Sequence, residues 1–296
     1  MKLEQGIISE IVKIPNYTRT IISEKFNVSE STARAYMTFI ENMNSIWEKP
    51  KKSVKTYIVS GCWHVPFHNK VLYEGFKDLL RDINPDGLVL AGDFLDVGGL
   101  SEYERGKMSK TGVTLEDEYI AANEILDEIE SILSPTAEKF YLYGNHCARY
   151  FRWKADVNNS KYGDLLSPTR GMKLIERGYT VKEDYMNDFI ELGSLQVLHG
   201  YYFNVHCAKM HLDKLRRNNM FVHTHRFQVY REGNFAGFNI GFMGEINAPC
   251  FAYATRTMRE AWSNGFALVH VQDDGKFFVE MVDVVNSHFI YGGKKY

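Results

Sequence analysis

The feature that most constrains this fold is a series of short apolar runs, each followed at once by a cluster of His, Asp or Asn. Four of these runs have the length and composition of β-strands: 56–59, 88–91, 140–143 and 195–198. They alternate with stretches of helical periodicity, including 71–83 and 115–133. Near the end, 266–271 and 277–284 flank an Asp-Asp-Gly turn, which predicts a hairpin. This alternation predicts an α/β sandwich with a largely buried sheet.

The clusters contain residue types that bind metal ions. The loops at the ends of neighbouring strands gather at one edge of a sheet, so we expect these side chains to meet there. Each cluster alone is as consistent with an ordinary turn or a structural histidine, and their joint occurrence is what predicts a site. In chain order they are Cys62-Trp63-His64, Gly92-Asp93-Phe94-Leu95-Asp96, Gly144-Asn145-His146, His199-Gly200 and His223-Thr224-His225.

In this order the clusters resemble the motifs of the calcineurin-like metallophosphoesterase superfamily: D-x-H, G-D-x-x-D, G-N-H-[DE], H and G-H-x-H. The resemblance covers roughly residues 55–285. It implies a four-layer α/β/β/α fold that holds two divalent metal ions. The ligands it implies for the first metal are Cys62, His64, Asp93 and His225, and those for the second are Asp93 as a bridge, Asn145, His199 and His223.

The resemblance also implies a reaction, the hydrolysis of a phosphoester by a metal-bound hydroxide without a covalent enzyme intermediate. A bridging carboxylate such as Asp93 can hold two cations about 4 Å apart, so that they clamp one phosphate. His146 would protonate the leaving oxygen, and Asp96 would orient His146 by accepting its other ring proton. Arg149 and Arg226 follow the third and fifth motifs closely enough to reach a bound phosphate, although each fits a surface arginine equally well.

Two cysteines depart from the superfamily pattern, because Cys62 and Cys147 stand where it has acidic residues. A Cys62 thiolate would be a soft ligand, so among manganese, zinc and iron it favours zinc or ferrous iron. Three interpretations stay open: a working soft ligand, a weak first site that leaves an effectively mononuclear centre, or an inactive protein. Val222 replaces the first glycine of the fifth motif, and every other ligand position matches.

Residues 1–48 are predicted to form a separate module, joined by a linker over 49–54 to a metallophosphoesterase domain over 55–296. Within the module, 18–26 and 30–43 have the pattern of two short helices joined by a tight turn. Small Ser23 and Ala33 would let these helices cross closely, and Asn27 tolerates the positive φ of such a turn.

This two-helix segment resembles the DNA-binding helix-turn-helix, with Ser29 as the N-cap of the second helix. Ser31, Thr32 and Arg34 would then lie near a duplex. Arg34 is the only basic residue of the second helix before Met43, so any affinity for a duplex would be modest and sensitive to salt. A small dimerisation or docking module is the alternative. Further cations available to phosphates are Lys49, Lys51, Lys52 and Lys55.

Composition sets the remaining limits. The net charge of −2 argues against a uniformly basic coat for nucleic acid, although residues 1–56 carry nine Lys and Arg against six Asp and Glu. The sequence contains neither a signal-peptide pattern nor an apolar run long enough to span a membrane, which predicts a cytoplasmic protein without a membrane partner. Its four cysteines show no paired spacing, so we expect reduced thiols.

The preferred hypothesis is a phosphoesterase that its N-terminal module brings to nucleic acid, where it cleaves phosphodiesters or removes terminal phosphates. Together with the C-terminal residues 291–296, this combination resembles phage-encoded metallophosphoesterases. One alternative substrate is a small phosphoester such as a nucleotide. Another alternative is a non-hydrolytic DNA-binding or interaction protein on the same scaffold. Residues 150–188, rich in Lys, Arg, Asn and Tyr, fit either a helical cap that contacts a polyanion or a solvated surface; the oligomeric state is left open.

Overall fold

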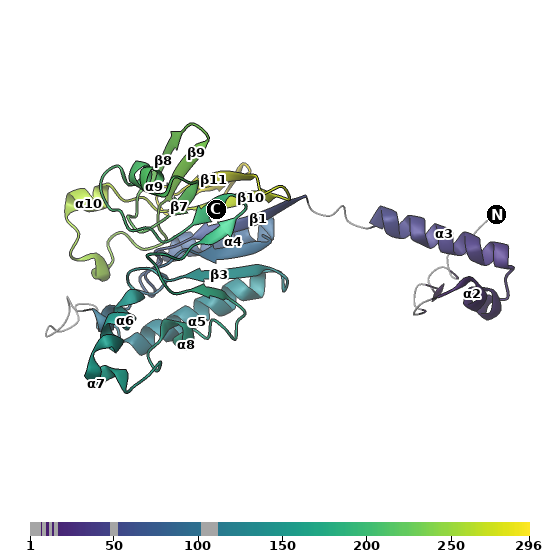
Figure 1. The fold of residues 1–296 in the computed structure, drawn as a ribbon, viewed down its shortest axis with the longest axis horizontal. Coiled ribbons are helices and arrows are strands. Elements are labelled where there is room, and N and C mark those ends of the chain that lie inside the picture. The colour runs from purple at the N-terminus through teal and green to yellow at the C-terminus, as the bar shows by residue number, and fades with distance from the viewer. Residues whose placement is uncertain (1–6, 8–9, 12–13, 15–16, 48–52, 102–111) are drawn as a thin grey trace. The chain divides into compact units, whose positions relative to one another are not determined.

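The computed structural model describes residues 7, 10–11, 14, 17–47, 53–101 and 112–296 (Figure 1). The chain divides into two compact units, Met1–Ser53 and Val54–Tyr296, and each is described by itself. Most of the predicted linker, including Lys49, Lys51 and Lys52, lies outside the described residues.

The N-terminal unit contains α2 (Arg19–Phe26) and α3 (Glu30–Trp47). Asn27 ends α2 in the left-handed conformation, with φ of 47°, as the sequence predicted. The Ser29 hydroxyl accepts the N–H of Thr32 at 3.2 Å, which agrees with its expected role as a cap. A small core holds the helices together and consists of Ile11, Ile22, Ala33, Tyr36 and Ile40.

The larger unit is built on a six-stranded sheet with the order β11-β10-β1-β2-β3-β4. Strands β1 to β4 are parallel, whereas β10 is antiparallel to β1 and β11 to β10, which confirms the predicted hairpin. Its strands are β1 (Val54–Ser60), β2 (Gly87–Leu90), β3 (Glu138–Leu142), β4 (Thr180–Lys182), β10 (Gly265–Gln272) and β11 (Phe277–Asp283).

A second sheet of five strands has the order β5-β6-β7-β9-β8, in which β6, β7 and β9 are parallel. Sequence analysis identified only β6 among them. Its strands are β5 (Ile190–Leu192), β6 (Leu195–Val197), β7 (Asn219–Phe221), β8 (Phe227–Glu232) and β9 (Phe235–Ile240).

Side chains of the first sheet alternate between its two faces, and both faces are covered. The larger unit therefore has four layers (Figure 1). One face, with Ile58 and Leu88, packs on the helices α4 (Lys70–Ile83) and α5 (Leu115–Ile132). The opposite face, with Val59, packs against the second sheet. The outer face of the second sheet is covered by α9 (Cys207–Leu215). The predicted α/β/β/α sandwich is therefore confirmed.

Residues 150–188, for which the sequence left open a helical cap or a solvated surface, are only partly helical. The segment contains α6 (Ala148–Ala155), α7 (Val157–Ser160) and α8 (Pro168–Gly171), and then enters the first sheet as β4. Parallel pairing with β3 stabilises this short strand, and a three-residue strand has no periodicity of its own.

The other described elements are η1 (Gly98–Leu100), η3 (Pro249–Phe251), α10 (Arg256–Glu260), β12 (Ile290–Tyr291) and β13 (Lys294–Lys295). None of the helices that the structure describes is long and apolar enough to cross a bilayer.

His211 on α9 is buried against the second sheet, where its ring stacks on Phe221 with centroids 3.8 Å apart. Its Nε2 accepts the N–H of Tyr201 at 3.1 Å, and its Nδ1 donates to the Cys207 carbonyl at 2.9 Å. Burial lowers the pKa of His211 to about 4. The folded state therefore holds the His211 ring in its neutral form.

Acidification is expected to destabilise the fold through His211. Its pKa is lower in the folded state, so the unfolded state binds more protons, and stability is lost as the pH falls from about 6.5 towards 4. Between pH 7 and pH 5 wild type should lose about 2 kcal/mol more than His211→Gln, which cannot titrate. Denaturant unfolding at both values measures this difference. The exposed His288→Gln should follow wild type, and equal losses in wild type and His211→Gln would contradict the prediction.

Candidate metal centre

All five motifs follow the carboxyl ends of strands whose parallel neighbours bring them to one edge. The loops after β1, β2 and β3 carry the first three motifs, and those after β6 and β7 carry the last two. The two sheets pack face to face, so the loops of both sheets contribute to one cluster.

The first group of potential ligands consists of Cys62, His64 and His225, whose ligand atoms lie within 4.8 Å of one another. The Nε2 atoms of His64 and His225 are 3.3 Å apart. All three side chains are buried. These are three of the four residues expected to hold the first metal.

The second group consists of Cys62, Asp93 and His199, again within 4.8 Å of one another. His199 Nε2 lies 3.2 Å from Asp93 Oδ2, 3.0 Å from Asn145 Oδ1 and 3.2 Å from His223 Nδ1. The residues expected at the second metal are thus brought together. Cys62 is common to both groups, whereas the sequence had assigned it to the first metal alone.

The chemistry of this donor set fits divalent cations. Burial is the main cause that lowers the pKa of His64, of His223 to about 3, and of His225, and so keeps these rings in the neutral form that binds metals. His225 Nδ1 is buried without a hydrogen-bond partner in the described part of the chain. Burial, and then Asp93, raises the pKa of the Cys62 thiol well above its usual value, and a bound cation acts in the opposite direction.

Five of the predicted ligands have left-handed backbone conformations. Their φ angles are 48° at Cys62, 50° at His64, 48° at Asp93, 36° at His223 and 57° at His225. Residues with a Cβ adopt this region at a cost, and such strain concentrates at functional sites.

The glycine of the third motif makes room for the centre. A Cβ on Gly144 would overlap the carboxylate of Asp93. That carboxylate also accepts the N–H of His146 at 2.9 Å. The glycine therefore allows the second and third motifs to approach closely.

His146 and Asp96 lie beside the ligands. His146 Nδ1 donates to the Asp96 backbone carbonyl at 2.7 Å, and the Asp96 carboxylate lies 3.2 Å from the Nδ1 atoms of both His146 and His64. The expected contact therefore involves the backbone as well as the carboxylate. The Asp96 carboxylate also contacts His64, which the motif did not predict.

Of the two arginines expected to reach a phosphate, Arg149 is at the centre. Its guanidinium donates to the Asp96 carbonyl at 2.7 Å and lies 3.2 Å from His146 Nε2. Within the described part of the chain, no hydrogen bond or ion pair connects the Arg226 side chain to these residues. The two arginines, equivalent in the sequence, therefore differ in the structure.

Sequence reasoning missed Glu118, a buried carboxylate of α5. It accepts the N–H groups of Val97 at 2.6 Å and Gly98 at 3.0 Å, and so supports the loop that carries Asp96. Burial, and next the Asp96 charge, raises the pKa of Glu118 to about 8. In the sequence it is one of three acidic residues in the first helical turn, where acids are common, so no signal distinguished it.

An aromatic wall behind the first ligand group was also missed. The ring of His225 stacks on Phe242, with centroids 4.3 Å apart and an angle of 9°. Phe251 packs against His64 at 4.8 Å, and Trp262 against His225 at 4.7 Å. These rings come from a region without a motif, and they fix the orientation of both histidines.

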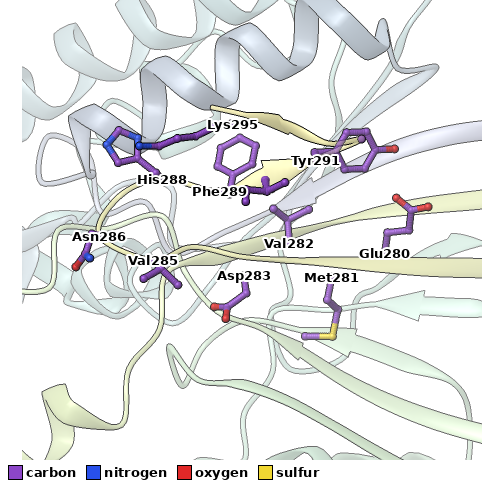
Figure 2. Close-up of a pocket in the computed structure, with 12 residues that line it drawn as sticks. Glu280, Met281, Val282, Asp283, Val285, Asn286, His288, Phe289, Tyr291 and Lys295 are labelled. Atoms are coloured by element: carbon purple, nitrogen blue, oxygen red, sulfur yellow. The ribbon is translucent and has the colours of Figure 1, made fainter.

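A separate pocket of about 840 Å³ lies between β11 and the C-terminal strands β12 and β13 (Figure 2). Figure 2 shows Glu280, Val282, Phe289 and Lys295 among its walls. It contains none of the predicted site residues, so this pocket is not the metal centre.

This fold and donor set define the class of metal-dependent phosphoester hydrolases. The profile of the family described as calcineurin-like phosphoesterase matches residues 55–238, and the chain belongs to this family.

Solved structures resemble the chain at low identity. Vacuolar Protein Sorting 29 from Cryptosporidium parvum is 13% identical, with a TM-score of 0.45 over 83% of this chain and 96% of that chain. Wild-type Vps29 from Entamoeba histolytica complexed with zinc is 13% identical, with a TM-score of 0.38 over 77% and 98%. A conserved protein from Streptococcus pneumoniae, described as a predicted phosphoesterase, is 15% identical, with a TM-score of 0.33 over 82% of this chain and 97% of that chain. No curated protein sequence matches the chain.

Proposed function

We propose that this phosphoesterase holds two divalent cations and hydrolyses phosphoesters of nucleic acid. The observation that carries the dinuclear part is the convergence of two ligand groups that share Cys62. Cys62, His64, Asp93 and His225 would hold one cation, and Asp93, Asn145, His199 and His223 the other, with Cys62 close enough to both ligand groups to act as a second shared ligand. Cations bound there would supply Lewis-acid activation of water and of the phosphoryl group.

His146 is proposed as the proton donor to the leaving oxygen. Its Nδ1 is occupied by Asp96, and Nε2 accepts from Arg149 at 3.2 Å, so Nε2 would carry that proton once Arg149 turns to the substrate phosphate. The Asp96 carboxylate, 3.2 Å from Nδ1, would hold the ring in this orientation, as carboxylates do behind catalytic histidines. Arg149, beside Nε2, would pair with phosphate oxygens of the substrate.

The identity of the first ligand favours zinc or ferrous iron. The thiol of Cys62 is fully buried among imidazoles and a carboxylate, and sulfur is a softer donor than the aspartate of the superfamily pattern. A mixed set of sulfur, nitrogen and oxygen donors is typical of zinc and iron sites in proteins.

The N-terminal unit supports nucleic acid as the substrate. The left-handed turn at Asn27 and the close packing at Ala33 have the features of a helix-turn-helix, and Ser31 and Arg34 are exposed at the start of the second helix. The Thr32 hydroxyl already makes a hydrogen bond with the Ser29 hydroxyl at 2.9 Å, so it is less available to a duplex.

The test combines metal analysis, hydrolysis and duplex binding. Purified protein is expected to contain two metal ions per chain and to hydrolyse chromogenic phosphodiesters and DNA. Arg34→Ala should weaken binding to a duplex, reducing the slope of log affinity against log salt by roughly one, while hydrolysis of the small ester stays unchanged. No bound metal and no turnover would sink the hydrolase. Hydrolysis of small esters without duplex binding would favour a nucleotide as the substrate.

A further inference from the structure

A pocket of about 420 Å³ opens beside the second ligand group. One wall comes from α6 and the other from the loop after β4. Its lining residues are Ala148, Phe151, Arg152, Glu183, Asp184 and Tyr185.

Two contacts join this pocket to the metal centre. The Arg152 guanidinium donates to the backbone carbonyl of Asn145 at 3.5 Å. The Tyr185 ring lies edge-on to the ring of His199, with centroids 6.4 Å apart and an angle of 75°. A molecule that reacts at the second ligand group therefore has this pocket next to it.

The walls of the pocket are held in place by the fold. Glu183 accepts the hydroxyl of Thr169 at 2.7 Å. Asp184 accepts the N–H of Met186 at 3.0 Å, which fixes the turn that carries Tyr185. Phe151 packs on Tyr143, with ring centroids 5.7 Å apart. Such a pre-formed site loses little conformational entropy when a ligand binds.

The charges and rings of the pocket select the chemistry of its ligand. Glu183 and Asp184 outnumber Arg152, so the pocket itself disfavours a phosphate. The rings of Phe151 and Tyr185 favour a flat aromatic group, and the Glu183 carboxylate favours one that donates hydrogen bonds. Arg152 stands where the pocket meets the centre, so it can pair with a phosphate attached to that group.

We propose that this pocket binds the nucleobase of the nucleotide next to the scissile phosphate. The inference rests on the proposed hydrolysis of nucleic acid, and it assigns Phe151, Arg152 and Tyr185 as residues that set specificity. A base carrying an amino group, such as adenine, suits Glu183, since both oxygens of Asp184 already accept hydrogen bonds within their own turn.

Two esters with the same leaving group test the pocket: adenosine 5′-(p-nitrophenyl phosphate) and methyl p-nitrophenyl phosphate. Wild type should prefer the adenosine ester in kcat/KM. Phe151→Leu should reduce the ratio of the two values at least about fivefold, the lower end of what losing one base–aromatic stack costs. Phe278→Leu is the matched control, because Phe278 is an exposed phenylalanine on β11, 58% accessible against 39% for Phe151. A ratio near one in wild type, or one unchanged in Phe151→Leu, would overturn the proposal.

Binding of adenosine alone separates failure of the pocket from failure of the proposed reaction. Saturation-transfer NMR should detect adenosine bound to wild type and to Phe278→Leu, with a weaker signal for Phe151→Leu and Tyr185→Leu. If neither ester is hydrolysed but this pattern is seen, the pocket stands and the reaction fails. Equal signals in all four proteins, or none in wild type, would overturn the base-binding pocket whatever the activity.

Discussion

Asp93→Asn is expected to lower kcat/KM for a phosphodiester at least about a thousandfold, the upper end of what removing one electrostatic stabiliser costs. The Asp93 carboxylate lies 3.2 Å from His199 and accepts the N–H of His146, so it connects the ligand loops of the two sheets. Asparagine keeps the shape of the side chain but loses the negative charge that a ligand shared by two cations requires. Steady-state kinetics and metal analysis by mass spectrometry measure both effects.

Asp274→Asn is the control for this substitution. Asp274 is an exposed acid in the turn between β10 and β11, remote in sequence from all five motifs. It should retain wild-type rate and metal content. If Asp93→Asn matched it in both, Asp93 would not be a metal ligand and the proposed centre would be wrong.

Cys62→Asp is expected to reverse the metal preference of the protein. Aspartate restores the hard oxygen donor of the superfamily pattern, which suits manganese and magnesium better than a thiolate does. Zinc affinity should fall at least about tenfold, since mutation of a residue that only hydrogen-bonds to a metal ligand already costs that much. Competition with a chromogenic chelator measures the affinity. Cobalt substitution provides a second measurement, because a sulfur-to-cobalt absorption band should be present in wild type and absent from Cys62→Asp.

Cys207→Ser is the matched control, since Cys207 is also buried but belongs to α9. It should keep the cobalt band. A wild-type protein without that band, or a Cys62→Asp protein with undiminished zinc affinity, would show that Cys62 is not a ligand. The interpretation with a weak first site would then be preferred.

The sequence predicted the strands with continuous apolar runs and missed the shorter ones. All of β2 and the carboxyl-terminal parts of β1 and β3 are buried, so their apolar residues run together. β7 has only three residues, and β8 is largely accessible, so neither leaves a pattern. Pairing with neighbours stabilises such strands, and pairing partners are not visible in a single sequence.

The residues of the candidate site also fall into those that the sequence predicted and those that it did not. Residues at fixed spacing after a strand were predictable, because the strand aims the loop. Glu118, Phe242 and Trp262 reach the centre from a helix and from distant loops, where only tertiary packing sets the distance. The choice between Arg149 and Arg226 also depended on packing, since each follows a motif equally closely.

The left-handed backbone at the predicted ligands sets the stability of the fold against the metal centre. An L-residue in that conformation costs about 1 kcal/mol or more relative to glycine, and five predicted ligands share it. Glycine at any of these positions would relieve strain while removing a ligand, so drift towards a more stable fold would erode the centre. At these five positions the stability of the fold and the binding of metal therefore make opposite demands on the side chain.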